Sequence, residues 1–148
     1  MKFRHFYIAL AALALIVAMP VAAERLPTTN PGSHAAQISG TPGRVTEDIF
    51  PVRIAEIDGR NIRPRETLWL EPGRYEFRVL VDVPSGALGP RQGIDSLRWR
   101  AAGAETRREA LTIELEVEAG KIYQIRARYN RQGGEGFPWS TVLWRVDE

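Results

Sequence analysis

An alternation of apolar and polar residues with period two is the feature that most constrains how this chain can fold. In 74–83 every second residue from Tyr75 to Val83 is apolar, and three of the four residues between them are polar. Successive side chains of a strand point to opposite faces, so this pattern predicts a sheet packed on one side. The alternation recurs in 110–117 and 122–129, and no helical stripe follows residue 23. The chain is therefore predicted to be all-β.

Shorter segments complete the predicted set of strands. Residues 50–57, 67–70 and 139–146 have strand patterns, and turn dipeptides such as Asp58-Gly59 separate them from their neighbours. About six or seven strands with Gly and Pro turns, and no crossover helices, predict a single antiparallel β-sandwich. A small β-barrel is the alternative.

The segments 110–117 and 122–129 are predicted to form a hairpin, because only the turn 118–121 separates them. Outward glutamates of the first strand would then face outward arginines of the second, as Glu114 would face Arg126. Exposed pairs of this kind are worth about 0–1 kcal/mol, so they would help the strand register more than the stability.

The first 23 residues predict a cleavable, helical export signal. Lys2 and Arg4 precede an apolar run at 6–17, and small residues follow up to Ala23. The run is shorter than the roughly 20 residues that span a bilayer, so cleavage before Glu24 is expected rather than a retained anchor. We therefore expect the mature protein in the periplasm, with secretion as the alternative and no stable membrane insertion.

Charge and cysteine content exclude two classes of chemistry. The chain has 20 basic and 18 acidic residues, and the signal carries two of the basic ones and no acidic one, which leaves 18 of each. Because nucleic-acid binders carry a surplus of cations, no nucleic-acid partner is expected. The absence of cysteine excludes disulfides and thiolate chemistry.

After the signal the chain divides into a leader and one domain. Residues 24–47 are interrupted by prolines and glycines and are predicted as a flexible leader, with a short strand at 35–38 as the alternative. Residues 48–148 are predicted as the β-sandwich domain, which is long enough to form one core. Within this domain 84–108 lacks a regular pattern, and irregular segments of this length are often functional or disordered.

Part of the domain resembles a known family. In 52–83 a strand ending in Ile57-Asp58-Gly59 is followed by a Pro72-Gly73 turn and a strand that contains aromatic residues. This order resembles PEGA-type and transthyretin-like (carboxypeptidase-regulatory-like) β-sandwich modules of bacterial envelope proteins, and 117–123 is similar to the second hairpin of small exported proteins of this kind. The chain lacks the Pro-Glu-Gly-Ala tetrad, and the insert 84–108 has no counterpart. The resemblance implies a non-catalytic accessory or binding module, with no site residues to transfer.

Residue types that support catalysis or metal binding are sparse. His34 is the only histidine outside the signal, and no Gly-x-Ser-x-Gly elbow occurs. One histidine without cysteine does not make a zinc site, and the carboxylates lack calcium-loop spacing. Glu114 and Glu116 lie roughly 6–7 Å apart on one strand face, a spacing that a glycosidase could use, but a solvated face is the favoured interpretation of them. We expect no enzyme, no catalytic residue, no cofactor and no metal.

Tryptophan and arginine supply the candidate partner-binding residues. These are Trp69, Arg98, Trp99, Arg100 and Trp139. On strand parity Trp139 falls opposite Val142 and Trp144, which are assigned to the core, and Trp69 likewise falls opposite leucines. Exposed Trp and Arg side chains are enriched at binding hot spots, and tryptophan stacks on sugar rings. Burial of each tryptophan is the favoured interpretation, and exposure of these side chains is the premise of the binding hypotheses.

The sequence therefore favours a non-enzymatic, exported accessory or binding domain of the bacterial cell envelope. We expect it to engage another envelope protein through the insert around 91–100 and an open sheet edge. The alternative is a carbohydrate-binding module that binds a glycan with Trp69, Trp99 and Trp139, and a small glycoside hydrolase dependent on Glu114 is a third hypothesis. The sequence makes no prediction of oligomeric state.

Overall fold

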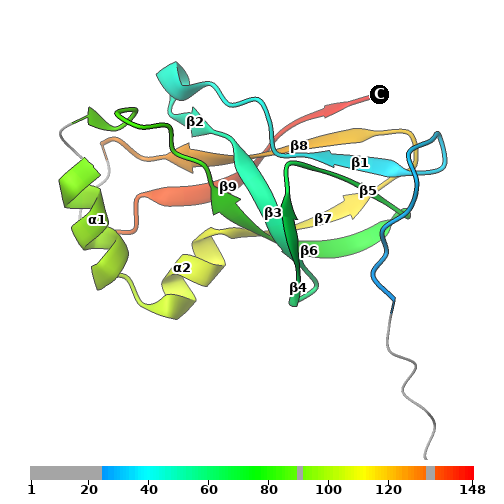
Figure 1. Cartoon of the computed structure of the whole chain (residues 1–148), viewed down its shortest axis with the longest axis horizontal. Coiled ribbons are helices and arrows are strands. Elements are labelled where there is room, and N and C mark those ends of the chain that lie inside the picture. The colour runs from blue at the N-terminus through cyan, green and yellow to red at the C-terminus, as the bar shows by residue number, and fades with distance from the viewer. Residues whose placement is uncertain (1–24, 90–91, 133–135) are drawn as a thin grey trace, which may run out of the picture.

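Two β-sheets share one hydrophobic core, and two helices lie together at one end of the molecule (Figure 1). The computed structural model describes residues 25–89, 92–132 and 136–148. The predicted all-β class is confirmed, with nine strands in place of the six or seven expected. The predicted export signal lies outside the described residues. None of the helices within the described ranges has the length and apolar character needed to cross a membrane.

The first sheet has five strands in the order β2-β8-β1-β5, and β9 also pairs with β8. Their bounds are β1 Ala36–Ser39, β2 Ile49–Phe50, β5 Thr67–Leu70, β8 Ile122–Tyr129 and β9 Trp139–Asp147. The sheet is antiparallel except for β1, which runs parallel to β8 and aligns Ile38 with Tyr123. A short 3-10 helix, Val45–Glu47, lies between β1 and β2.

The second sheet has four antiparallel strands in the order β4-β3-β6-β7. Their bounds are β3 Val52–Ile57, β4 Arg60–Arg65, β6 Gly73–Val81 and β7 Thr112–Val117. The alternation predicted for β6 is confirmed, because Phe77 and Val79 are buried while Glu76 and Leu80 are exposed. Strand β4 was not predicted, since most of its side chains are polar and exposed and it carries no alternating apolar pattern.

The predicted hairpin between β7 and β8 is wrong, because these strands belong to different sheets. β7 pairs with β6, and β8 pairs with β9 and with the strands near the N-terminus. The turn 118–121 passes from one sheet to the other, with Gly120 at a φ of 79° that favours glycine. Glu114 forms an ion pair with Arg74. Arg126 is 1% exposed and does not face the glutamates of β7.

The segment expected to be a leader contributes a strand inside the first sheet. β1 confirms the short strand that was the alternative for this region, and Ala36 and Ile38 are fully buried. At its end Gly40 approaches β3 so closely that a Cβ would lie 1.9 Å from the carbonyl oxygen of Val52. The β-structure therefore begins before residue 48, which corrects the expected boundary between leader and domain.

The insert 84–108, predicted to lack regular structure, contains two helices. They are α1, Gln92–Ala101, and α2, Ala104–Ala110. Neither produced a helical stripe in the sequence, because α2 buries no residue and α1 leaves Leu97 64% exposed. The two helices lie beside one end of the second sheet, near the start of β7 (Figure 1).

Trp139 is 6% exposed, so the strand parity that turned it away from the core is wrong and the interpretation of Trp139 as a buried residue is confirmed. A β-bulge shifts the register of β8 and β9 between Gln124 and Ile125. Before the bulge Trp139 lies opposite Tyr129, and after it Val146 lies opposite Tyr123. Because of this shift, the alternation between inward and outward side chains does not continue unbroken along β9. The prediction that residues 142, 144 and 146 belong to the core is therefore wrong, and Val146 is 42% exposed.

Trp139 belongs to an aromatic cluster in the core. Its ring lies 5.0 Å from the ring of Phe50 at an interplanar angle of 81°, and 5.0 Å from the ring of Tyr129. Edge-to-face pairs of this kind add about 0.5–1.5 kcal/mol beyond the burial of their surface. The cluster connects β2, β8 and β9 at one end of the first sheet.

Candidate functional site

A groove with a volume of about 470 Å³ lies between strand β6 and the two helices of the insert. We call it the arginine groove, because four arginines line it together with a tryptophan and several aliphatic side chains. Its lining includes Arg53, Arg78, Arg107, Arg108, Trp99 and Leu80.

The strands of the second sheet place one end of the groove. Arg53 of β3 lies directly opposite Leu80 of β6 in the register. The Nε of Arg53 donates to both carboxylate oxygens of Asp82, at 3.1 and 3.0 Å. This half-exposed pair adds little stability, but it fixes where the guanidinium group lies.

A buried carboxylate holds two further arginines. Glu56, which is 5% exposed, follows the register shift in β3 and lies opposite Arg78. Its Oε1 lies 2.5 Å from Nη2 of Arg78, and its Oε2 lies 3.2 Å from Nη2 of Arg108. A buried carboxylate needs cationic partners to offset its desolvation, so this triad is required by the fold as well as shaping the groove.

Arg107 connects the two helices and has a different set of partners. Its Nη1 donates to the backbone carbonyl of Trp99 at 2.8 Å and to that of Ala102 at 2.6 Å. These carbonyls lie at and just beyond the C-terminal end of α1, where helical carbonyls lack amide partners and the helix dipole favours a cation. Within the described part of the chain, Arg107 forms no ion pair with a carboxylate.

The described residues that line the groove carry four cationic side chains and no anionic one. Arg53 pairs with Asp82, while Arg78 and Arg108 share Glu56. Four guanidinium groups thus meet two carboxylates among the described residues, and the Nε of Arg78 is buried without a hydrogen-bond partner there. Guanidinium groups in this setting can bind a carboxylate or a phosphate through paired N–H groups.

Trp99 supplies the aromatic wall of the groove. It is 40% exposed, and its ring packs against that of Phe137 with 5.2 Å between the centroids. Leu80, on the strand side of the groove, is 37% exposed. A cationic groove with exposed apolar surface can hold an anionic ligand that also has an apolar part.

Of the five predicted partner-binding residues, Trp99 is the one that the described structure places in the groove. Arg98 and Arg100 lie on the same helix. Trp69 is half-buried on β5, at the opposite end of the molecule from α1 (Figure 1). Trp139 is in the core, so the three tryptophans do not form one surface. Arg91 lies outside the described residues.

The arginines that sequence reasoning missed come from three separate segments. Arg53 and Arg78 occupy outward positions on strands in which apolar and polar residues alternate. This alternation is the one sequence pattern that indicates that their side chains face away from the core. Arg107 and Arg108 follow each other in a helix that the sequence did not reveal. Only the pairing of β3 with β6, and the packing of α2 beside them, brings these side chains together.

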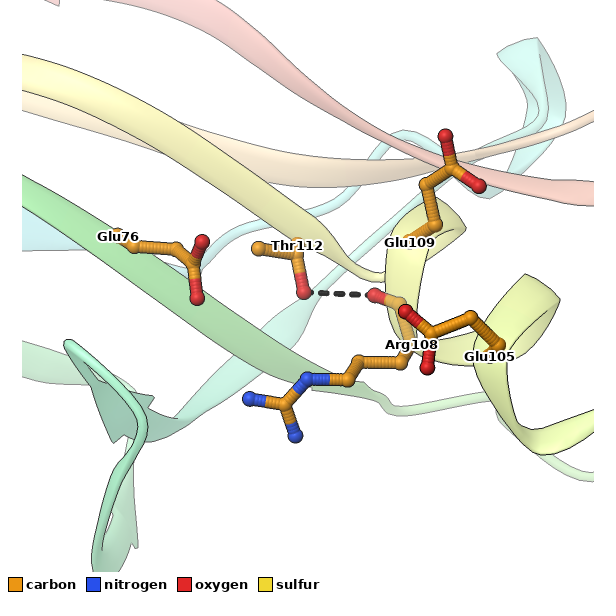
Figure 2. A pocket seen from close by; sticks show the side chains of 5 residues that line it. All are labelled: Glu76, Glu105, Arg108, Glu109 and Thr112. Atoms are coloured by element: carbon orange, nitrogen blue, oxygen red, sulfur yellow. Dashed lines mark hydrogen bonds between the residues drawn. The ribbon is translucent and has the colours of Figure 1, made fainter.

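A second hollow beside Arg108 is acidic, but its carboxylates do not form a site. Glu76, Glu105 and Glu109 line it with Arg108 and Thr112, and Thr112 Oγ1 donates to the carbonyl of Arg108 at 2.6 Å. Figure 2 shows that the three carboxylates point in different directions. No group of residues within the described ranges is arranged to hold a metal ion.

Arg126 is the one fully buried cation among the described residues, and it binds backbone rather than a carboxylate. It donates to the carbonyls of Pro42 at 2.5 Å, Ser39 at 2.8 Å and Ile125 at 2.7 Å, and to Oε1 of Gln124 at 2.9 Å. Burial, and after it the charge of Arg145, lowers the pKa of Arg126 to about 10. The role of Arg126 is structural, because it ties the chain after β1 to β8.

No protein-family model, curated protein or solved structure matches this chain. The resemblance of 52–83 to PEGA-type and transthyretin-like modules therefore stays a prediction.

Proposed function

We propose that this protein is a non-enzymatic, exported accessory domain of the bacterial cell envelope that binds a protein partner through the arginine groove and the exposed side of α1. The observation that carries the proposal is the position of Trp99. It is 40% exposed and lines the groove with Arg107, whose guanidinium group holds the carbonyl of Trp99. Tryptophan and arginine together are the residues most enriched at protein-binding hot spots.

The other two hypotheses have less support. A carbohydrate module built on three tryptophans loses Trp139 to the core, and strand β5, which carries Trp69, lies away from α1 (Figure 1). The glycosidase hypothesis needs Glu114 free to act on substrate, whereas its carboxylate is paired with Arg74. Export to the periplasm, or secretion, is supported by the pattern of the first 23 residues.

Photo-crosslinking in the source organism tests the proposal directly. Benzoylphenylalanine is introduced at position 99 of the full reading frame, and at position 69 as a matched control on another tryptophan. We expect a discrete protein adduct after irradiation from position 99 and none from position 69. No protein adduct at position 99, or the same adducts at both positions, would contradict a groove-specific protein partner.

Tryptophan fluorescence separates the glycan alternative. A titration of the purified protein with soluble fragments of envelope glycans is expected to leave the emission unchanged. Saturable quenching that Trp99→Ala abolishes would instead favour carbohydrate binding.

N-terminal sequencing tests the proposed export. The protein recovered from the periplasm is expected to begin at Glu24.

A further inference from the structure

We infer that the arginine groove recognises an acidic, extended segment of the partner protein that also carries an apolar side chain. The inference rests on the proposed function and adds the chemistry of the partner. It follows from the charges of the groove, from the hydrogen-bond donors that remain there and from its exposed apolar surface.

The charge balance sets the sign of the partner. Four arginines line the groove, and their carboxylate partners among the described residues are Asp82 and Glu56. The described residues that line the groove itself include no carboxylate, whereas Glu76, Glu105 and Glu109 line the neighbouring hollow beside Arg108. A segment with carboxylates would complement the arginines of the groove, since complementary charges across an interface provide specificity and faster association.

Unused donors show where a carboxylate would bind. Both hydrogen bonds of Arg107 use Nη1, so the described structure leaves its other N–H groups available. The Nε of Arg78 is buried without a hydrogen-bond partner in the described chain, so a docked segment would meet the N–H groups of Arg107 rather than this one.

Apolar surface beside these donors indicates an amphipathic partner. Leu80 and Trp99 line the groove and are 37% and 40% exposed, and Leu97 on α1 is 64% exposed. An acidic segment without an apolar side chain would leave this surface in water. An aromatic or aliphatic side chain packed on Trp99 would bury it and add the larger part of the affinity.

The chain's own N-terminal segment does not have the required chemistry. Residues 25–35 contain Arg25 and no aspartate or glutamate, so they would add to the positive charge of the groove. An acidic segment of another protein is the occupant that fits the charge. Anionic lipid surfaces remain a separate outcome that the experiment tests.

Selection from a random twelve-residue peptide library tests the inference. The protein is expressed from its full reading frame, exported and immobilised, and parallel selections use Arg53→Gln/Arg107→Gln and the control Arg63→Gln. Arg63 lies on β4, is exposed and does not line the groove. Peptides enriched by the natural sequence and by Arg63→Gln are expected to have a net charge of about −2 or lower and at least one aromatic residue.

Affinity of the consensus peptide provides the quantitative readout. Its Kd is expected to rise about tenfold when its acids are replaced by amides, and similarly in Arg53→Gln/Arg107→Gln. It should also weaken by about tenfold between roughly 0.05 and 0.5 M NaCl, since salt screens exposed charges. If the double variant fails to fold, Leu80→Glu serves as the second variant, because it adds a negative charge at an exposed groove position and should weaken binding equally.

The outcomes separate this inference from the proposed function. Enriched peptides without acidic excess, equal binding of the amide peptide, or no enrichment would overturn the acidic-segment inference, while a crosslinked protein at position 99 would still support a protein partner. Binding to phosphatidylglycerol vesicles but not to acidic peptides would overturn it in favour of a lipid surface. Acidic peptides bound equally by Leu80→Glu would place their site outside the groove and also overturn it.

Discussion

Arg107 Nη1 donates a hydrogen bond to the backbone carbonyl of Trp99 across 2.8 Å, and this contact ties the second helix of the insert to the end of the first. The same nitrogen reaches the carbonyl of Ala102. Because α2 buries none of its residues, this polar contact is a principal link between the two helices. It also sets where the backbone that carries the Trp99 ring lies.

Arg107→Gln is expected to loosen the insert without unfolding the β-sheets. Glutamine is too short to reach both carbonyls, so backbone amides of α2 should exchange with deuterium about tenfold faster, while those of β8 keep their protection. Hydrogen exchange measured by mass spectrometry resolves the two regions. Arg100→Gln, an exposed change on α1, is the control. Equal exchange in the two variants would show that Arg107 does not hold the helices.

Glu56→Gln is expected to lower the free energy of unfolding by about 2–3 kcal/mol, as measured by urea titration. The change leaves Arg78 and Arg108 without their carboxylate, and their partial exposure keeps the cost below the 3–5 kcal/mol of a fully buried pair. Glu114→Gln removes an exposed partner of Arg74 and should cost less than about 1 kcal/mol. A Glu56 effect no larger than the Glu114 effect would argue against a buried triad.

Gly40→Ala is expected to destabilise the protein by about 3 kcal/mol. The added Cβ would meet the backbone carbonyl of Val52. This carbonyl cannot move away without disturbing the hydrogen bond from the amide of Val52 to the carbonyl of Gly40, which joins the end of β1 to β3. Gly103→Ala is the matched control, because no atom lies within 4 Å of its added Cβ and its φ of −62° suits alanine. Both changes affect the unfolded chain alike, so the difference in their melting transitions isolates the close contact. Equal transitions would contradict it.

Trp139→Ala is expected to cost about 3–5 kcal/mol, because it removes a buried indole from the cluster with Phe50 and Tyr129. Trp69→Ala, at a half-buried position, should cost about 1–2 kcal/mol. Chemical denaturation of both variants tests the ranking. The reverse order would contradict the burial of Trp139 in this cluster.

Arg126→Met is expected to cost about 3 kcal/mol, because it leaves several backbone carbonyls without a donor. Burial lowers the folded-state pKa of Arg126 to about 10, below its unfolded value, so the native state binds this proton less tightly. Any stability change from this group therefore appears only above about pH 10, where stability would rise with pH. The measured loss should be equal at about pH 6 and about pH 9, where Arg126 is protonated in both states. A loss that varies between them would contradict this account.

Local pattern predicted most of the strands but not which strands would pair. The alternation in β6 identified its buried face because Phe77 and Val79 pack inward at every second position. The same alternation in β7 and β8 is equally compatible with a hairpin and with two separate sheets. The bulge near Ile125 was invisible for a related reason, since a register shift depends on the partner strand.

The groove was harder to predict because its chemistry is assembled from distant segments. Sequence reasoning chose Trp99 because it lies between arginines, but its neighbours in space are Arg107 of the next helix and Phe137. Helix α2 buries none of its side chains, so no apolar period of 3.6 residues marks it in the sequence. Glu56 was not predicted as a buried carboxylate, because only the pairing of β3 with β6 shows its cationic partner.

The parallel pairing of β1 with β8 bears on when the protein can fold. Arg126 reaches the carbonyl of Ser39 across 87 positions of the chain, and β1 lies between β5 and β8 in the first sheet. During synthesis β1 must therefore wait for β8 to emerge before its row of hydrogen bonds can close. Contacts of such long sequence separation form slowly. The first sheet of the nascent chain therefore stays incomplete until β8 has left the ribosome, and a chain that is exported unfolded, as we propose, would complete this sheet only after export.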